Sequence, residues 1–319
     1  MSLHIGNCQA EPGEKKNGML EVGEHDPKLP MTLICGKEEG PTVLISAGIH
    51  GAEYMGIQTA MELSREIKPE EVKGNLIFLL VANPSAFKDF VRFTVPEDGR
   101  NLNRMFPGKE DGSLSERIAY TMVNKLYPKA DYFLDIHAGD TSERVMPFLY
   151  FPGGAGEEVV EASKNMAKAT DMAVRARSGS LIGACGCAGA NGIPSLLLER
   201  GGGGVFTREE VELYKQDIRN ILIRLKVLEG EEVHTVNQQS EVNKATYIEA
   251  ETEGFWYPAL NAGDQFCSGA LLGEIRDVWG DLKKAYYGEY DGIILYQTVG
   301  MGIKEGDPLV AYGMMEEGE

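Results

Sequence analysis

Two histidines and a glutamate stand where this chain could bind a metal ion. His50 and Glu53 are three residues apart and directly follow the apolar run 42–47. His137 ends a second apolar run, 132–136. If both runs form neighbouring strands, the three side chains meet at the carboxyl edge of one sheet. Two imidazoles and one carboxylate, with a fourth position open, are the ligand set of a catalytic zinc rather than a structural one. The sequence therefore predicts a metal-dependent hydrolase with one Zn²⁺ per chain.

The other histidines and the cysteines give no comparable cluster. The remaining three histidines lie in turn-rich or acidic segments and are expected at the surface: His4, His25 and His234. The five cysteines are odd in number and scattered, which is typical of reduced thiols in the cytosol. Cys185 and Cys187 could bind a metal, but no second pair accompanies them, so they are interpreted as small residues filling a loop.

The charge balance limits the kind of partner. The chain has 49 acidic and 31 basic residues and a formal charge of −18. Nucleic acids and anionic membranes are bound through many Lys and Arg side chains, so neither is expected as a partner. No signal peptide is visible at the N-terminus, and no apolar run approaches the roughly 20 residues that cross a bilayer. We expect a cytoplasmic protein that acts on a small molecule.

Apolar runs alternate with segments of helical length over the first two thirds of the chain. Strands are predicted at 42–47, 75–81, 131–136, 145–151 and 193–198, and helices at 53–67, 113–127, 156–171 and 206–227. Residues 1–30 are expected to form a hairpin or edge strands. Continuous apolar runs separated by helices are typical of a sheet covered on both faces. The sequence predicts an α/β fold with a mixed, largely parallel sheet.

The character of the chain changes near residue 230. An acidic break at 229–232 is followed by short β-like pieces and turns. We predict a catalytic domain over 1–230 and a small all-β domain over 231–319 with barrel-like or lipoyl-like hairpins. The lipoyl attachment motif itself is missing, so Lys283 and Lys284 are expected to be solvated. This part is expected to shape the site or an oligomer, and whether a homo-oligomer forms stays open.

Four motifs resemble the succinylglutamate desuccinylase/aspartoacylase family, which are zinc amidohydrolases related to the metallocarboxypeptidases. The motifs are Gly48-Ile49-His50-Gly51-Ala52-Glu53, Asn83-Pro84-x-Ala86-Phe87, Asn101-Leu102-Asn103-Arg104-x-Phe106-Pro107-Gly108 and Asp135-Ile136-His137. The resemblance covers roughly residues 40–205. It implies a zinc carboxypeptidase-like fold and assigns His50, Glu53 and His137 as zinc ligands.

The resemblance also implies catalytic residues. Glu199 matches the family's catalytic glutamate, which takes a proton from the metal-bound water; the alternative is an ion pair between Glu199 and Arg200. Arg92 matches the arginine that stabilises the developing oxyanion beside the zinc. Because the loop around Arg92 is long, Arg100 is a rival for that role.

Asn103 and Arg104 match the residues that bind the carboxylate of the substrate. A guanidinium suits this role because it can donate two parallel hydrogen bonds to one carboxylate. Asn101 stands where the family usually has an aspartate, which weakens any supporting hydrogen bond from this position. Asp135 alternates onto the same strand face as His137, and either orients that ligand or pairs with a cation.

The resemblance implies a deacylase that cleaves the amide bond of a small N-acylated amino acid, with ester hydrolysis within the same chemistry. A carboxypeptidase-like or amidase-like enzyme acting on a small peptide is the alternative. A non-catalytic binding protein is disfavoured, since all three ligands are kept. The substrate side chain stays open, because Asp140 and Glu143 would suit a basic end, as in the N-acetyl-diaminobutyrate deacetylases of this family. Two basic residues would suit an acidic end instead: Arg144 and Arg175.

Overall fold

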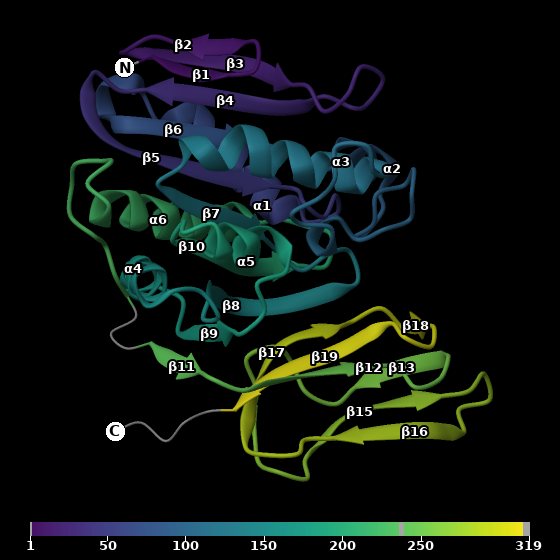
Figure 1. The fold of residues 1–319 in the computed structure, drawn as a ribbon. Helices are drawn as coiled ribbons and strands as arrows, with labels where there is room; N and C mark the ends of the chain where they lie inside the picture. The colour runs from purple at the N-terminus through teal and green to yellow at the C-terminus, as the bar shows by residue number, and fades with distance from the viewer. Residues whose placement is uncertain (1, 236–238, 315–319) are drawn as a thin grey trace.

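The computed structural model describes residues 2–235 and 239–314. Its centre is a large mixed sheet with helices on both faces, and a second sheet of four strands lies in the C-terminal part (Figure 1). The predicted α/β fold with a mixed sheet is confirmed. No helix in the described ranges is long and apolar enough to cross a membrane.

Four parallel strands form the middle of the large sheet. In spatial order they are β6 (Lys73–Leu79), β5 (Glu38–Ala47), β7 (Tyr132–His137) and β10 (Ser195–Gly202). Successive side chains of a strand point to opposite faces. Val43 and Ile45 accordingly pack into the core on one face, and Leu44 packs into the core on the other. Both faces are buried, which explains why these strands are continuous apolar runs in the sequence.

Antiparallel and shorter strands extend this centre on both sides. Beyond β6 lie β4 (Leu29–Cys35) and β3 (Glu14–Leu20), and a separate two-stranded ribbon pairs β1 (Leu3–Ile5) with β2 (Cys8–Ala10). On the other side β10 pairs with β8 (Glu143–Pro152), and β8 pairs with β9 (Val174–Ser178). The expectation of edge strands within residues 1–30 is confirmed.

Six α-helices occur in the described residues. They are α1 (Tyr54–Glu66), α2 (Pro84–Asp89), α3 (Leu114–Thr121), α4 (Glu157–Ala167), α5 (Gly183–Ala190) and α6 (Arg208–Arg224). Helices α1, α4 and α6 contribute to the core on one face of the sheet, and α3 and α5 to the core on the other. Ser113 and Glu116 form a capping box at the start of α3, where the sequence places a helix start. Val211, Tyr214 and Ile218 recur at helical spacing in α6 and are buried against the sheet.

Helix α5 corrects one interpretation of the sequence. Cys185 and Cys187 do not fill a loop but lie within this helix, and both are buried. The sequence GACGCAGA carries no polar face and no helical periodicity, so nothing marks it as a helix. Its glycines allow close packing, since a Cβ on Gly189 would lie 2.7 Å from the ring of Pro152.

In the described part of the chain after α6, all the regular elements are strands. Strands β17 (Gly292–Thr298), β19 (Pro308–Met314) and β12 (Ala245–Glu249) continue the large sheet beyond β8, while β11 (Ser240–Val242) pairs with β9 and β14 (Gln265–Phe266) with β17. Strands β16 (Leu282–Tyr287), β15 (Leu271–Arg276), β13 (Gly254–Pro258) and β18 (Gly302–Ile303) form the second sheet. A core that includes Trp256, Leu272 and Leu309 lies between the two.

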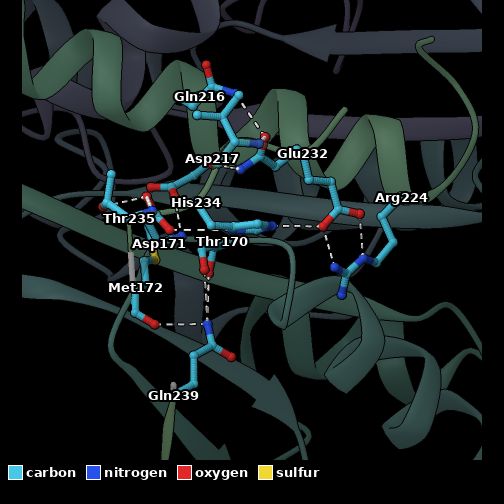
Figure 2. Close-up of polar contacts among 12 residues, drawn as sticks. Thr170, Asp171, Met172, Gln216, Asp217, Arg224, Glu232, His234, Thr235 and Gln239 are labelled. Carbon is cyan, nitrogen blue, oxygen red and sulfur yellow. Dashed lines mark hydrogen bonds and ion pairs between the residues drawn. The ribbon is translucent and has the colours of Figure 1, made fainter. Parts of the chain in front are cut away.

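The segment that leaves α6 is held by polar contacts to the loop between α4 and β9 (Figure 2). His234 Nε2 lies 2.9 Å from Glu232 Oε2, and His234 Nδ1 lies 3.4 Å from Asp171 Oδ1. Gln239 Nε2 donates to the carbonyl oxygen of Met172 at 2.8 Å. This connection is therefore fastened to the preceding part of the chain, and the domain boundary near residue 230 stays a prediction.

Candidate metal centre and substrate cavity

The three candidate ligands come from two adjacent parallel strands. His50 follows the end of β5, Glu53 is the residue before α1, and His137 is the last residue of β7. Glu53 lies between the two rings, with Oε1 2.6 Å from His50 Nδ1 and Oε2 3.0 Å from His137 Nδ1. One ligand atom from each of the three residues lies within 4.8 Å of the others. The structure thus brings the predicted ligands together.

Glycines allow the backbone to pass close to neighbouring elements here. Gly51 lies between two of the ligands, and a Cβ on it would lie 2.3 Å from the carbonyl carbon of Ala86. Gly56 in α1 brings the helix against β7, where a Cβ would lie 2.8 Å from the carbonyl oxygen of Ile136. Both distances are shorter than any real side chain tolerates, so these positions require glycine.

Each imidazole is oriented by an oxygen on the side away from the cluster. His50 Nε2 lies 3.1 Å from Asn101 Oδ1, which also accepts from the backbone N–H of Asn103 at 2.9 Å. His137 Nε2 lies 3.0 Å from Asp135 Oδ2, and the hydroxyl of Ser46 donates to Asp135 Oδ1 at 2.6 Å. Donation from Nε2 leaves both Nδ1 atoms available as ligands, which is the usual outer arrangement of metal-bound histidine.

These contacts show what Asn101 and Asp135 bind, which the sequence left open. Asn101, although it replaces the usual aspartate, does contact His50. The partners of Asp135 are His137 and Ser46 rather than a lysine or arginine.

The cluster has the electrostatics of a site that exchanges a proton for a metal. Burial opposes ionisation of Glu53, but His137 and His50 together hold its pKa at about 2. Burial also opposes a charged His137, yet Glu53 and Asp135 raise its pKa well above the ordinary value. Without a metal the carboxylates therefore retain a proton on an imidazole. A bound cation would replace that proton, because metal binding requires deprotonated ligands.

All seven residues that the sequence assigns to the site line one cavity of about 850 Å³. They are His50, Glu53, His137, Arg92, Asn103, Arg104 and Glu199. The cavity therefore joins the candidate metal centre to the predicted catalytic and substrate-binding side chains.

Glu199 lies on β10 opposite His137, one of the candidate ligands, in the parallel register. Burial raises the pKa of Glu199 well above the ordinary value; His137 counteracts this, while Glu53 and Glu143 add to it. Its Oε2 is buried and has no hydrogen-bond partner among the described residues. The alternative ion pair with Arg200 is not formed, because Arg200 Nη2 lies 2.7 Å from Asp217 Oδ2.

The two rival arginines lie in different places. Arg92 lines the cavity, and its Nε donates to Asp140 Oδ2 at 2.7 Å. Arg100 is paired with Glu116, with Nη1 3.3 Å from Oε2, and is not among the lining residues. The position of Arg92 therefore suits the oxyanion role, and that of Arg100 does not.

Asn103 and Arg104 belong to a short 3₁₀ turn at Leu102–Arg104. Asn103 Oδ1 accepts from the backbone N–H of Ala184 at 2.9 Å, so α5 fixes its orientation. The side chain of Arg104 remains exposed to the cavity.

Sequence reasoning missed part of the cavity wall. Tyr150 from β8, Tyr247 and Glu249 from β12, and Tyr296 from β17 all line it. The hydroxyls of Tyr150 and Tyr247 are 3.1 Å apart. Tyr150 lies in a predicted strand and could have been found from strand alternation. Tyr247 and Tyr296 are distant in sequence, and only the pairing of β17 with β8 brings Tyr296 to the site.

Comparison with known proteins gives the class that this fold and cavity define. The model of the succinylglutamate desuccinylase/aspartoacylase catalytic domain matches residues 39–225. The chain belongs to this family.

Individual relatives extend the similarity over nearly the whole chain. The N-alpha-acetyl-L-2,4-diaminobutyric acid deacetylase of Halomonas elongata is 28% identical over 91% of this chain and 86% of its own length. A product-bound structure of the ectoine utilization protein EutE (DoeB) from Ruegeria pomeroyi has a TM-score of 0.83, is 25% identical, and covers 96% of both chains. A succinylglutamate desuccinylase/aspartoacylase from Rhodobacter sphaeroides has a TM-score of 0.83 at 26% identity, over 95% of this chain and 96% of its own.

Proposed function

We propose that this protein is a zinc-dependent hydrolase that cleaves the amide bond of a small N-acylated amino acid. One observation carries the proposal. The three clustered donors and a buried glutamate with an unpartnered oxygen face the same cavity, and the family consists of enzymes named for such deacylations.

The donor set fits a catalytic zinc. His50, Glu53 and His137 supply two nitrogens and a carboxylate, and three protein donors leave a position for water or substrate. Asn101 and Asp135 fix both rings with Nδ1 toward the cluster. When bound there, the metal would lower the pKa of its water toward neutrality and polarise the scissile carbonyl.

The remaining residues suit the other steps of amide hydrolysis. Glu199 is proposed to accept the proton of the attacking water and to pass it to the leaving nitrogen, since its unpartnered oxygen is buried near His137 and Glu53. Arg92, anchored by Asp140, is proposed to stabilise the negative charge that develops on the carbonyl oxygen. Arg104 is proposed to bind the carboxylate of the amino acid, with Asn103 as the neighbouring polar group.

The test combines metal analysis with an amine-release assay. The purified protein is expected to hold about one zinc per chain, and His50→Ala and His137→Ala are each expected to lose it. His4→Ala, a change at an exposed histidine on β1, is the matched control and should keep the metal.

The assay presents zinc-loaded protein with N-acetyl and N-succinyl amino acids and with dipeptides. Release of amine from the N-acyl compounds supports the proposal. Hydrolysis confined to dipeptides would instead support the peptidase alternative. Inactivity of metal-loaded protein on the whole panel would contradict both.

A further inference from the structure

One acidic side chain of the cavity has no part in the mechanism above. Glu143 is the first residue of β8 and lines the cavity. Its carboxyl accepts a hydrogen bond from the backbone of Asp140. No lysine, arginine or histidine within the described ranges forms an ion pair with it.

The charged residues near the site differ in whether another side chain or the backbone already binds them. Asp140 is occupied by Arg92. Arg144 is exposed and its Nη1 donates to the carbonyl oxygen of Gly202 at 2.7 Å, while Arg175 is paired with Glu241. Of the four residues that left the substrate charge open in the sequence, only Glu143 lines the cavity without an ion pair or hydrogen bond to a charged side chain; the charge of Arg92 acts on it from farther away.

The charges lining the cavity do not balance without a cation. Arg92 and Asp140 neutralise each other, and a divalent metal would offset Glu53 and Glu199. Arg104 would be engaged by the carboxylate of the proposed substrate. Two acidic residues then remain: Glu143, which a bound cation would help to ionise against its raised pKa, and the exposed Glu249. A second carboxylate on the substrate would add to this excess of negative charge, whereas an ammonium group would reduce it.

The surroundings of Glu143 also suit a cation. Burial, together with Asp140 and Glu53, raises the pKa of Glu143 to about 8 even though Arg92 lowers it, so the site disfavours an isolated negative charge and gains from a further positive one. Tyr150, Tyr247 and Tyr296 line the same cavity, and the rings of Tyr247 and Tyr296 have centroids 6.4 Å apart. Aromatic faces attract ammonium groups, and the effect grows as water is excluded.

We propose that Glu143 binds a positively charged group on the side chain of the substrate. The preferred substrates are then N-acylated amino acids with a cationic side chain, and not those with a second carboxylate. This inference rests on the proposed amidohydrolase function.

The test uses three substrates that differ in side-chain charge. Nα-acetylornithine is cationic, Nα-acetylnorleucine is its neutral counterpart of nearly equal shape, and Nα-acetylglutamate is acidic. The zinc-loaded wild type is expected to show kcat/KM at least about tenfold higher for the ornithine compound than for the norleucine compound, and lowest for the glutamate compound. Glu143→Gln is expected to remove most of the preference for ornithine by raising KM for that substrate alone.

The control variant is Glu158→Gln, which neutralises an exposed carboxylate on α4 away from the cavity. It should keep the wild-type selectivity. An unchanged ornithine preference in Glu143→Gln would overturn the inference. An equal loss of kcat on all three substrates would also overturn it, because Glu143 would then act as a general base.

A binding experiment separates this inference from the proposed function. Calorimetric titration of free ornithine and free norleucine into the wild type and Glu143→Gln needs no turnover. Tighter binding of ornithine to the wild type only would support the cation site even if no N-acyl compound were hydrolysed. Equal binding of the two amino acids by the wild type would contradict it.

Discussion

At the scale of single residues, the candidate ligands and the candidate base are held in different ways. Both imidazoles are oriented by oxygens behind them, Asn101 for His50 and Asp135 for His137. Glu199 has a buried oxygen without a partner. Fixed rings favour tight metal binding, while an unpartnered carboxylate beside them is suited to accept a proton.

This difference gives a prediction for Glu199→Gln. The substitution is nearly isosteric and leaves all three metal donors in place, so zinc content should stay close to that of the wild type. The loss of kcat should be about 100-fold or more, which is the usual scale for a positioned acid–base group. Zinc content, melting temperature and kcat are measured on the same preparation. A metal-loaded variant with wild-type turnover would require another base, and Glu143 would be the next candidate.

At the scale of elements, the sequence predicted the parts of the site that follow apolar strands. His50 and His137 were placed correctly because β5 and β7 are continuous apolar runs, and parallel neighbours end at the same edge. Helix α5 was missed because its small residues have no helical periodicity. Tyr247 and Tyr296 were missed because their approach to the cavity depends on pairing between distant strands, which no local pattern encodes.

The turn between β5 and α1 gives a prediction at this scale. Gly51→Ala would place a Cβ 2.3 Å from the backbone of Ala86, so the turn that carries His50 and Glu53 must move. We expect zinc affinity to fall by at least about tenfold, the scale seen when ligand-orienting contacts are lost, and the melting temperature to fall with it. Gly302→Ala is the control, because nothing lies within 4 Å of a Cβ there. Unchanged zinc affinity in Gly51→Ala would show that the ligand geometry does not depend on this close approach.

At the scale of the whole molecule, the C-terminal strands are joined to the catalytic part in two ways. β17 pairs with β8, with Tyr296 opposite Val145, and so covers an edge of the central sheet (Figure 1). Tyr247, Tyr296 and Pro308 also form part of the cavity wall. An uncovered β8 would present unpaired backbone groups to solvent. These contacts predict that the residues on either side of position 230 fold together.

The chain offers two probes that report separately on its two parts. Its two tryptophans, Trp256 and Trp279, both lie after residue 230, while the α-helices of the described residues all end by Arg224. Tryptophan fluorescence therefore follows the C-terminal strands, and circular dichroism at 222 nm is dominated by the helices of the catalytic part. In a urea titration we expect the two signals to give the same midpoint, since coincident transitions are the mark of one cooperative unit.

The variant Trp256→Ala tests the coupling between the two parts. It empties part of the C-terminal core, where Trp256 is 2% exposed and its Nε1 donates to the carbonyl oxygen of Thr298 at 2.9 Å. Such a change costs about 3–5 kcal/mol of the free energy of unfolding. If the chain unfolds as one unit, this loss should lower the dichroism midpoint as well, although the helices all lie before residue 230. Trp279→Ala, at an 84% exposed position, is the control and should leave that midpoint unchanged. Wild-type fluorescence that changes at a lower urea concentration than the dichroism, with the dichroism midpoint unchanged in Trp256→Ala, would show instead that residues 231–319 unfold as an independent domain.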